Sequence, residues 1–239
     1  MDARLAQIIR DTSKRGGKII IPSFALERAQ EIVYALRRLE NGHDVPRVPV
    51  YVDSPMTVNI TEVFRLHPEC FDEHMREFIS EEGDPFAAQY IRYVRRVEDS
   101  MKLNELRGPA IIISASGMCE SGRILHHLRN NCEDARNTIL IVGFQAKHTL
   151  GRRIVERERE IKIFGVKRPL NADVQVLNGF SAHAGRSELI AFGQRFKECA
   201  QHLLLVHGEE EAMGALKSNL ESKGQTNVRI QKEGVPIEF

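Results

Sequence analysis

Four short aliphatic runs constrain the fold of this chain more than any other feature of the sequence. Each run is almost continuously apolar, which is typical of a strand buried on both faces of a parallel sheet. Segments with helical apolar spacing lie between the runs, and Ser54 is placed to cap one of these helices, with Pro55 at its first position. The expected strands are residues 18–21, 48–52, 109–113 and 138–142. This alternation of strand and helix predicts an α/β protein built on a parallel sheet.

The remaining elements follow from the same kind of pattern. Residues 3–14 have helical spacing and end at the pair Gly16 and Gly17. We expect residues 55–102 to be mostly helical, with breaks at Pro68 and near Gly83. Further strands are expected at 161–166, 172–177, 203–206 and 228–231, with helices at 186–197 and 209–221.

Two histidines, His183 and His207, follow the ends of predicted strands and precede predicted helices. In open α/β sheets, ligands bind at the carboxyl ends of the strands. A histidine there can bind a metal or transfer a proton, and it can also be a loop residue whose ring nitrogens are satisfied by the protein. The residues alone leave both interpretations open.

A run of small residues, Ser114 to Gly117, lies between a predicted strand and a predicted helix. Small residues there let backbone N–H groups approach an anion such as phosphate. The run matches neither a Walker loop nor a dinucleotide-binding fingerprint, so an ordinary tight turn is the alternative.

The chain has 34 basic and 33 acidic residues, so any polyanion-binding surface must be local. The most basic region runs from Lys147 to Arg168, but glutamates interrupt it, and a solvated salt-bridged face explains it equally well. Cys119, His126, His127 and Cys132 have a spacing that fits no common zinc pattern.

The 239 residues suffice for one large or two modest domains. The four cysteines form no Cys-x-x-Cys pair, and the sequence shows no signal peptide, which favours a cytoplasmic location. No apolar run approaches the length of a membrane-spanning helix.

Six segments together resemble the β-CASP family of RNA-processing nucleases with a metallo-β-lactamase fold. They occur in the family's order along nearly the whole chain, and Phe180–His183 and Leu205–Glu209 resemble its motifs B and C. The other segments are Gly16–Gln30, Val52–Met56, Ile113–Met118 with Gly122 and Arg123, and Val142–Ala146 with Thr149–Arg152.

The resemblance implies a fold, a cofactor and roles for individual residues. The implied fold is a parallel-sheet β-CASP domain, residues 1–155, followed by the C-terminal portion of a metallo-β-lactamase αββα fold, residues 156–239. The family uses two zinc ions to hydrolyse a phosphodiester of RNA. His207 would be a zinc ligand, and His183 would lie against the phosphate and donate a proton to the leaving oxygen. Ser114, Ser116, Gly117 and Ser181 would contact the RNA substrate.

One part of the family pattern is missing from this sequence. No His-x-His-x-Asp-His motif occurs, although the family places it before the β-CASP region. We therefore expect the chain to be the C-terminal part of such an enzyme and to need the missing N-terminal metallo-β-lactamase half as a partner. Alone, it should be inactive and should not hold zinc stably.

Three functions are compatible with these observations. The first is an RNA-processing nuclease, present here without half of its metal site. The second is a non-catalytic RNA-binding or scaffolding subunit, against which the presence of both His183 and His207 argues. The third is a Rossmann-like nucleotide-binding module, which the absence of the fingerprint disfavours. The oligomeric state stays open, with a homodimer among the alternatives.

Overall fold

The computed structural model describes residues 1–41, 45–180, 183–232 and 234–236. The chain forms two compact units, Met1–Ser181 and Ala182–Phe239, and each is described by itself. The domain boundary predicted between residues 155 and 156 separates two family domains, whereas these units are defined by compactness. That boundary stays a prediction. No helix in the described ranges is both long and apolar enough to cross a membrane.

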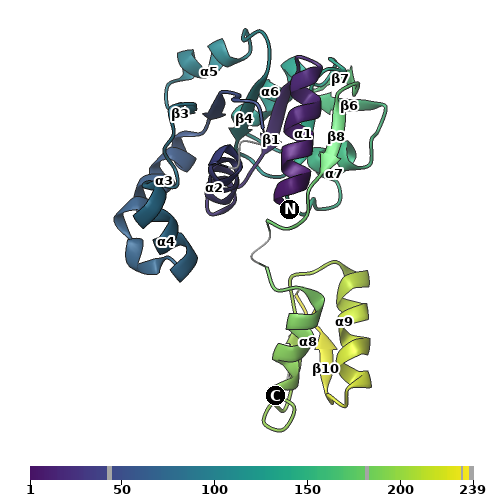
Figure 1. Ribbon diagram of the computed structural model, residues 1–239. Coiled ribbons are helices and arrows are strands. Elements are labelled where there is room, and N and C mark those ends of the chain that lie inside the picture. The colour runs from purple at the N-terminus through teal and green to yellow at the C-terminus, as the bar shows by residue number, and fades with distance from the viewer. Residues whose placement is uncertain (42–44, 181–182, 233, 237–239) are drawn as a thin grey trace. The chain divides into compact units, whose positions relative to one another are not determined.

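The first unit is built on a sheet of six strands, all parallel, in the order β3-β2-β4-β1-β5-β8 (Figure 1). The strands are β1 (Lys18–Pro22), β2 (Val50–Val52), β3 (Ile91–Tyr93), β4 (Ala110–Ser114), β5 (Thr138–Ile141) and β8 (Asp173–Val176). The predicted parallel α/β architecture is therefore confirmed.

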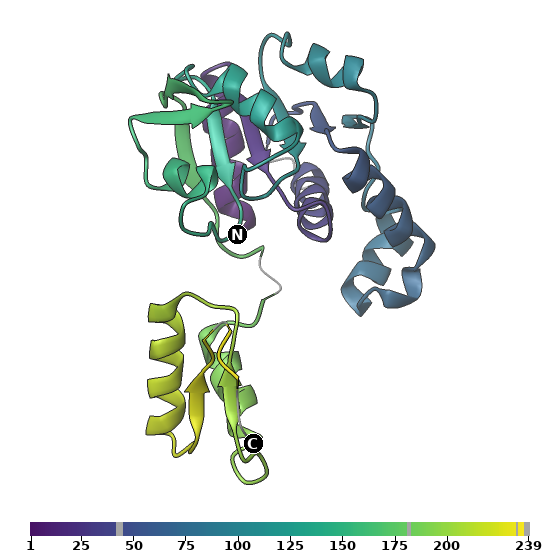
Figure 2. The ribbon, with the colours of Figure 1, turned by 180° about the vertical axis from the view of Figure 1, so that it is seen from behind.

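Helices cover both faces of this sheet, as Figures 1 and 2 show from opposite sides. Successive side chains of a strand point to opposite faces, so Ile19 and Ile21 join one hydrophobic core and Ile20 joins another. The first core includes α1 (Asp2–Lys14) and α2 (Arg28–Asn41), and the second includes α6 (Arg123–Asn131) and α7 (Leu150–Val155). Two-sided burial explains why these strands read as continuous aliphatic runs.

The segment between β2 and β4 is mostly helical, as predicted, but it also contains a strand that the sequence did not predict. It contains α3 (Pro55–Leu66), the 3₁₀ turn Pro68–Cys70, α4 (Glu73–Glu82) and α5 (Val97–Leu103), but also β3, which pairs with β2 at the edge of the sheet. The exposed Arg92 interrupts the apolar pattern of this three-residue strand, so the sequence did not reveal it. Ser54 caps α3 as predicted, because its hydroxyl accepts a hydrogen bond from the Thr57 amide.

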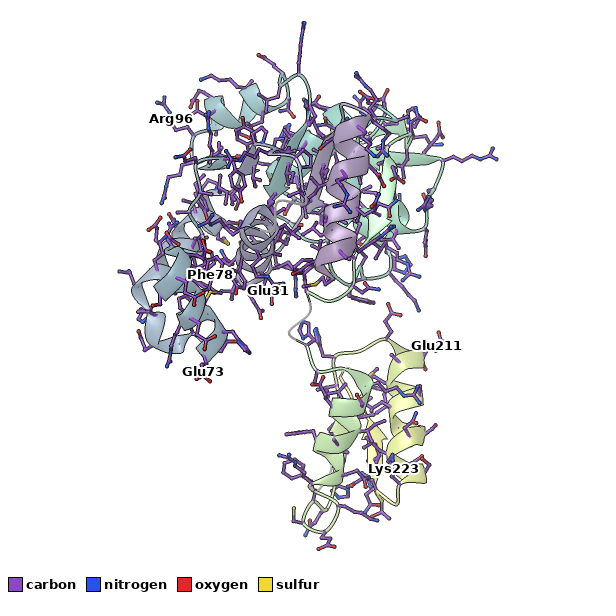
Figure 3. All side chains as sticks on the ribbon, in the orientation of Figure 1. Glu31, Glu73, Phe78, Arg96, Glu211 and Lys223 are labelled. Carbon is purple, nitrogen blue, oxygen red and sulfur yellow. The ribbon has the colours of Figure 1, made fainter. Side chains whose placement is uncertain are left out.

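The α4 helix is held against α2 by an aromatic contact. The ring of Phe78, which is labelled in Figure 3, meets that of Tyr34 on α2 edge to face. The two ring centroids are 5.0 Å apart. Such a pair adds roughly 0.5–1.5 kcal/mol to the free energy gained from burial alone.

The strand predicted at 161–166 is wrong in its extent. The structure has an antiparallel hairpin, β6 (Glu160–Ile163) and β7 (Val166–Pro169). Its turn residues Phe164 and Gly165 both have positive φ, at 50° and 79°. The one residue in the sequence that indicates this turn is Gly165. It lies inside an apolar run, which by itself predicts a continuous strand.

The second unit contains two parallel strands, β9 (Leu203–Leu205) and β10 (Val228–Ile230), with helices α8 (Arg186–Gln194) and α9 (Glu210–Ser222). Gly193 lets α8 and α9 pack closely, because an added Cβ would lie 2.7 Å from a methyl carbon of Leu220, which would have to move. Leu189, Phe192 and Val206 nevertheless remain exposed. This unit therefore leaves much of its apolar surface exposed. A sheet of only two strands is marginally stable by itself.

Candidate functional site

Four loops of the first unit leave the carboxyl edge of the sheet. They follow β1, β2, β4 and β5, and they precede α2, α3, α6 and α7. Because these strands are parallel and neighbouring, their carboxyl ends meet at one edge, which is where α/β sheets bind ligands. The small-residue run at Ser114–Gly117 belongs to the loop after β4.

The loop after β4 depends on two glycines. A Cβ on Gly117 would lie 2.8 Å from the ring of Phe24 and 3.0 Å from the Phe24 backbone nitrogen. Gly122 has a φ of +81°, and a Cβ there would lie 2.8 Å from the carbonyl oxygen of Ala115. Larger residues would push the loop away from its neighbours, so small residues are needed for close packing at both positions.

The loop after β5 braces the loop after β4. The Gln145 side-chain amide donates to the carbonyl oxygen of Gly117 at 3.0 Å, and the Gly151 amide donates to that of Met118 at 3.1 Å. Glu120 adds a third contact between the two loops, because its carboxylate accepts a hydrogen bond from the Leu150 amide at 2.6 Å. The small-residue loop therefore lies beside the beginning of the basic stretch.

The structure places three of the four predicted substrate-binding residues. Ser114 is 1% exposed, and its hydroxyl donates to the carbonyl oxygen of Asp53 at 2.8 Å. Ser116 is partly exposed and accepts from the Glu120 amide at 3.3 Å, whereas Gly117 is buried beneath Phe24. Ser181 lies outside the described residues. Of the three described residues, Ser116 is the one that carries a hydroxyl and is partly exposed in the loop.

Exposed aromatic side chains lie at the same edge, and the sequence analysis did not single them out. Phe24 is 46% exposed and follows β1, and Phe144 is 64% exposed and follows the neighbouring β5. Exposed phenylalanine rings carry an apolar face on which a planar ligand can stack. The available signal was their position directly after strands, in loops that also contain glycine and serine.

A buried carboxylate holds the loops after β2 and β4 in place. Asp53 is fully buried, and its oxygens accept from Nε2 of His127 at 2.7 Å, Nη1 of Arg123 at 2.7 Å and the hydroxyl of Ser100 at 2.5 Å. Arg123 also donates to the carbonyl oxygens of Val94 and Arg95. The cluster thereby joins the end of β2, the segment before α5 and the first turns of α6.

Asp53 is held in its ionised form. Burial opposes ionisation, but the hydrogen bonds from His127, Ser100 and Arg123 outweigh it and lower the pKa of Asp53 below 3.8. An ionised carboxylate only accepts, so the proton in the contact with His127 must be on Nε2. The Nδ1 atom lies 3.1 Å from the side-chain oxygen of Asn104.

The sequence alone does not reveal this cluster, because its members are far apart in the chain. In the sequence His127 belongs only to a spacing that fits no common zinc pattern. In the structure His126 is exposed against Phe164, whereas burial raises the pKa of the Cys119 thiol and raises that of Cys132 to about 11. A histidine on the apolar face of the α6 pattern was the available signal, because a buried imidazole needs polar partners.

His183 and His207 both lie in the second unit and are both exposed. They precede α8 and α9, as predicted, but the strands before them belong to different sheets: β8 to the six-stranded sheet and β9 to the two-stranded one. His207 has a φ of +58° and lines an apolar groove with Leu205 and Met213.

The donor set of the described residues does not fit a complete zinc site. Zinc in proteins takes three or four side-chain ligands. No group of three or more His, Cys, Asp or Glu side chains suited to a metal occurs among residues 1–41, 45–180, 183–232 and 234–236. His207 could supply one ligand, and the others would have to come from elsewhere.

Comparison with known proteins identifies two regions. Residues 29–154 match the family model described as the Beta-Casp domain, and residues 167–231 match the Zn-dependent metallo-hydrolase RNA specificity domain. Ribonuclease TTHA0252 of Thermus thermophilus is 39% identical over 233 residues, which are 97% of this chain and 52% of that protein. Transcription termination factor FttA of Methanosarcina mazei is 32% identical over 234 residues, 95% of this chain and 37% of that protein. The FttA of Methanocaldococcus jannaschii is 34% identical, with 87% and 34% covered. The chain thus spans about half of the ribonuclease and about a third of the termination factors.

The buried carboxylate gives a testable prediction. Replacing Asp53 by Asn should lower the free energy of unfolding by about 3–5 kcal/mol at pH 7, because Arg123 loses the charge that compensates it. The native pKa of Asp53 lies below its unfolded value near 3.8, so this stabilisation is present above pH 3.8 and is lost as the pH falls further. The difference between wild type and variant in urea unfolding should therefore narrow below about pH 4.

Asp134→Asn is the matched control, because Asp134 pairs with Arg136 at the surface. It should cost at most about 1 kcal/mol. An Asp53→Asn variant as stable as this control would show that the cluster contributes little.

The donor set predicts weak metal binding. After dialysis against metal-free buffer, the purified chain should hold well under one zinc per molecule by elemental analysis, since one probable ligand cannot enclose the ion. Stoichiometric zinc that disappears in His207→Ala would contradict this ligand count.

Proposed function

Because the chain belongs to the Beta-Casp family, we propose that it is the RNA-binding and C-terminal part of a zinc-dependent ribonuclease. The proposed reaction is hydrolysis of a phosphodiester of RNA. The observation that carries the proposal is the carboxyl edge of the sheet. There the exposed rings of Phe24 and Phe144 follow β1 and β5, on one side of the braced loop of small residues after β4. Rings can stack on bases, and a partly exposed hydroxyl can contact phosphate.

The aromatic and the polar residues of this edge would make different contacts with RNA. Phe24 and Phe144 would stack bases without regard to sequence, because every base has a planar face. Ser116 and the basic residues of α7 would contact the backbone. Arg153 is exposed at that helix, and α7 begins where the Leu150 amide meets Glu120. The arrangement suits a single strand better than a duplex, whose bases are stacked on one another.

The catalytic centre in this proposal is shared with residues outside this chain. His207 would supply one zinc ligand, and an N-terminal metallo-β-lactamase half would supply the remaining ones. Zinc, when bound, lowers the pKa of water and polarises the phosphate. His183 would hold a proton for the leaving oxygen, and its exposed position ahead of α8 leaves the ring accessible to substrate. The relatives' greater length supports this division, and so does the description of the matched C-terminal family.

One further proposal follows from the sequence alone, and the oligomeric state stays open. The cysteine pattern favours a cytoplasmic location. Pairing of two copies in a homodimer stays a prediction that gel filtration with light scattering can test.

Binding of RNA should depend on salt. The purified chain should bind a 12-nucleotide single-stranded RNA weakly in an anisotropy titration, and the affinity should fall as salt rises because phosphate contacts release counterions. Arg153→Glu should weaken binding and reduce the logarithmic salt slope by about 1.

Arg136→Glu provides the control, because it makes the same change in net charge just before β5, away from the carboxyl ends of the strands. It should leave the slope unchanged. Affinity that is independent of salt, or equal effects of the two variants, would count against phosphate contact at this edge.

Variants of His183 and His207 should show different roles for the two residues. The test requires that the N-terminal half is supplied, either fused or as a second chain, and that cleavage appears. His207→Ala should lower both zinc content and rate. His183→Ala should leave zinc nearly unchanged and slow single-turnover cleavage roughly 10²–10⁴-fold, as expected for a positioned acid.

The double variant should lose less than the product of the single losses, because groups that act on one transition state are not additive. If His183→Ala removes zinc while His207→Ala spares it, the roles are assigned to the wrong residues. If both variants keep full rate, the chain acts as a non-catalytic RNA-binding subunit.

A further inference from the structure

A second open groove lies between α5, α6 and the turn of the β6–β7 hairpin. Its volume of about 880 Å³ is within the range of ligand sites, roughly 300–1,000 Å³. It begins at Gly122, where the loop after β4 ends, and continues along α6. The lining residues that the argument uses are Asn104, Gly122, Arg123, His126, Arg129, Asn130 and Phe164.

Phe164 is the aromatic side chain of this groove. The residue is 51% exposed and lies in a hairpin turn with positive φ, a conformation uncommon for a residue other than glycine. The ring is positioned from α6, because the imidazole of His126 is 4.8 Å away and the guanidinium of Arg129 is 5.9 Å from its centroid. A half-exposed ring held in this way offers a flat apolar surface to a ligand.

The polar groups of the groove suit a base better than a chain of phosphates. Asp53 neutralises Arg123, and Glu105 lines the groove together with Arg129, so the net charge is small. The amide of Asn130 lines the groove and has no hydrogen-bond partner among the described residues, which leaves its donors and acceptor available. Amides read base edges through paired donor and acceptor atoms, and an aromatic ring stacks on the base plane.

The walls of the groove are fixed before any ligand binds. Asn104 contacts His127, and both Ser100 and Arg123 bind Asp53, so α5 and α6 are joined beneath the groove by the buried cluster. A preformed site loses less conformational entropy on binding. From Arg123 to Asn130, α6 rises roughly 10 Å, which is room for a base and its flanking phosphates.

We propose that this groove binds a base of single-stranded RNA, stacked on Phe164, with Arg129 beside its phosphate. The strand would reach the groove from the loop after β4 by way of Gly122. This deepens the proposed function, on which it rests, by adding a second contact point outside the carboxyl edge. The site would extend the length of single strand that the protein holds.

The test compares Phe164 variants on a 12-nucleotide RNA and on an oligomer of the same length whose sites are abasic. Phe164→Ala should weaken binding of the RNA roughly 5- to 150-fold, the range for loss of one stacked base. Phe164→Tyr should restore it, and Phe164→Leu should not. On the abasic oligomer all three variants should bind like the wild type, since no base is present to stack.

Val166→Ala is the control in the same hairpin, because Val166 is exposed and does not line the groove. It should leave affinity for both oligomers unchanged, and thermal unfolding of every variant should show that the fold is kept. Equal losses on the RNA and on the abasic oligomer would overturn the stacking role. If the wild type binds, Phe24→Ala weakens binding and Phe164→Ala does not, the groove assignment is wrong and the proposed function stands. If the wild type binds no RNA, both proposals are wrong.

Discussion

The loops at the carboxyl edge depend on one buried charge. Asp53 follows the last residue of β2, and its carboxylate is bound by side chains from α5 and from two turns of α6. An uncompensated charge in this position would cost several kcal/mol, whereas the three donors keep it ionised and fix the elements that carry them. The backbone of Asp53 also accepts from Ser114, which sets the start of the neighbouring loop. Both the small-residue loop after β4 and the groove along α6 therefore depend on the same group.

Much of the fold could be predicted from the sequence, because two-sided burial leaves an unbroken aliphatic run. Ile19–Ile21 and Ile111–Ile113 were recognised as strands for that reason. The strand Ile91–Tyr93 was missed, since a charged residue faces solvent at its centre, and the hairpin turn at Phe164 and Gly165 was hidden inside an apolar run. The motifs found the loop at Ser114–Gly117 and its basic neighbour. They could not show that Ser114 is occupied by the protein's own backbone, because that contact joins two strands distant in sequence.

The two histidines that first suggested chemistry stand in a different physical setting from the Asp53 cluster. His127 is enclosed and has partners on both ring nitrogens, whereas His183 and His207 are exposed in a unit with few strands. Position after a strand was a sound guide to accessibility. It carried no information about how many further ligands surround His207, since those depend on residues brought together in three dimensions.

The order of the strands also affects how the chain is made. The first strand, β1, lies in the interior of the sheet and pairs with β4 and β5, so Lys18 has no partner until Ala110 has been synthesised. At ribosomal rates of about 5–20 residues per second, the three isoleucines of β1 wait on the order of ten seconds for a neighbour. During that interval they form an exposed apolar segment with strong strand preference. The nascent chain therefore exposes, for that time, three residues that the finished protein buries almost completely.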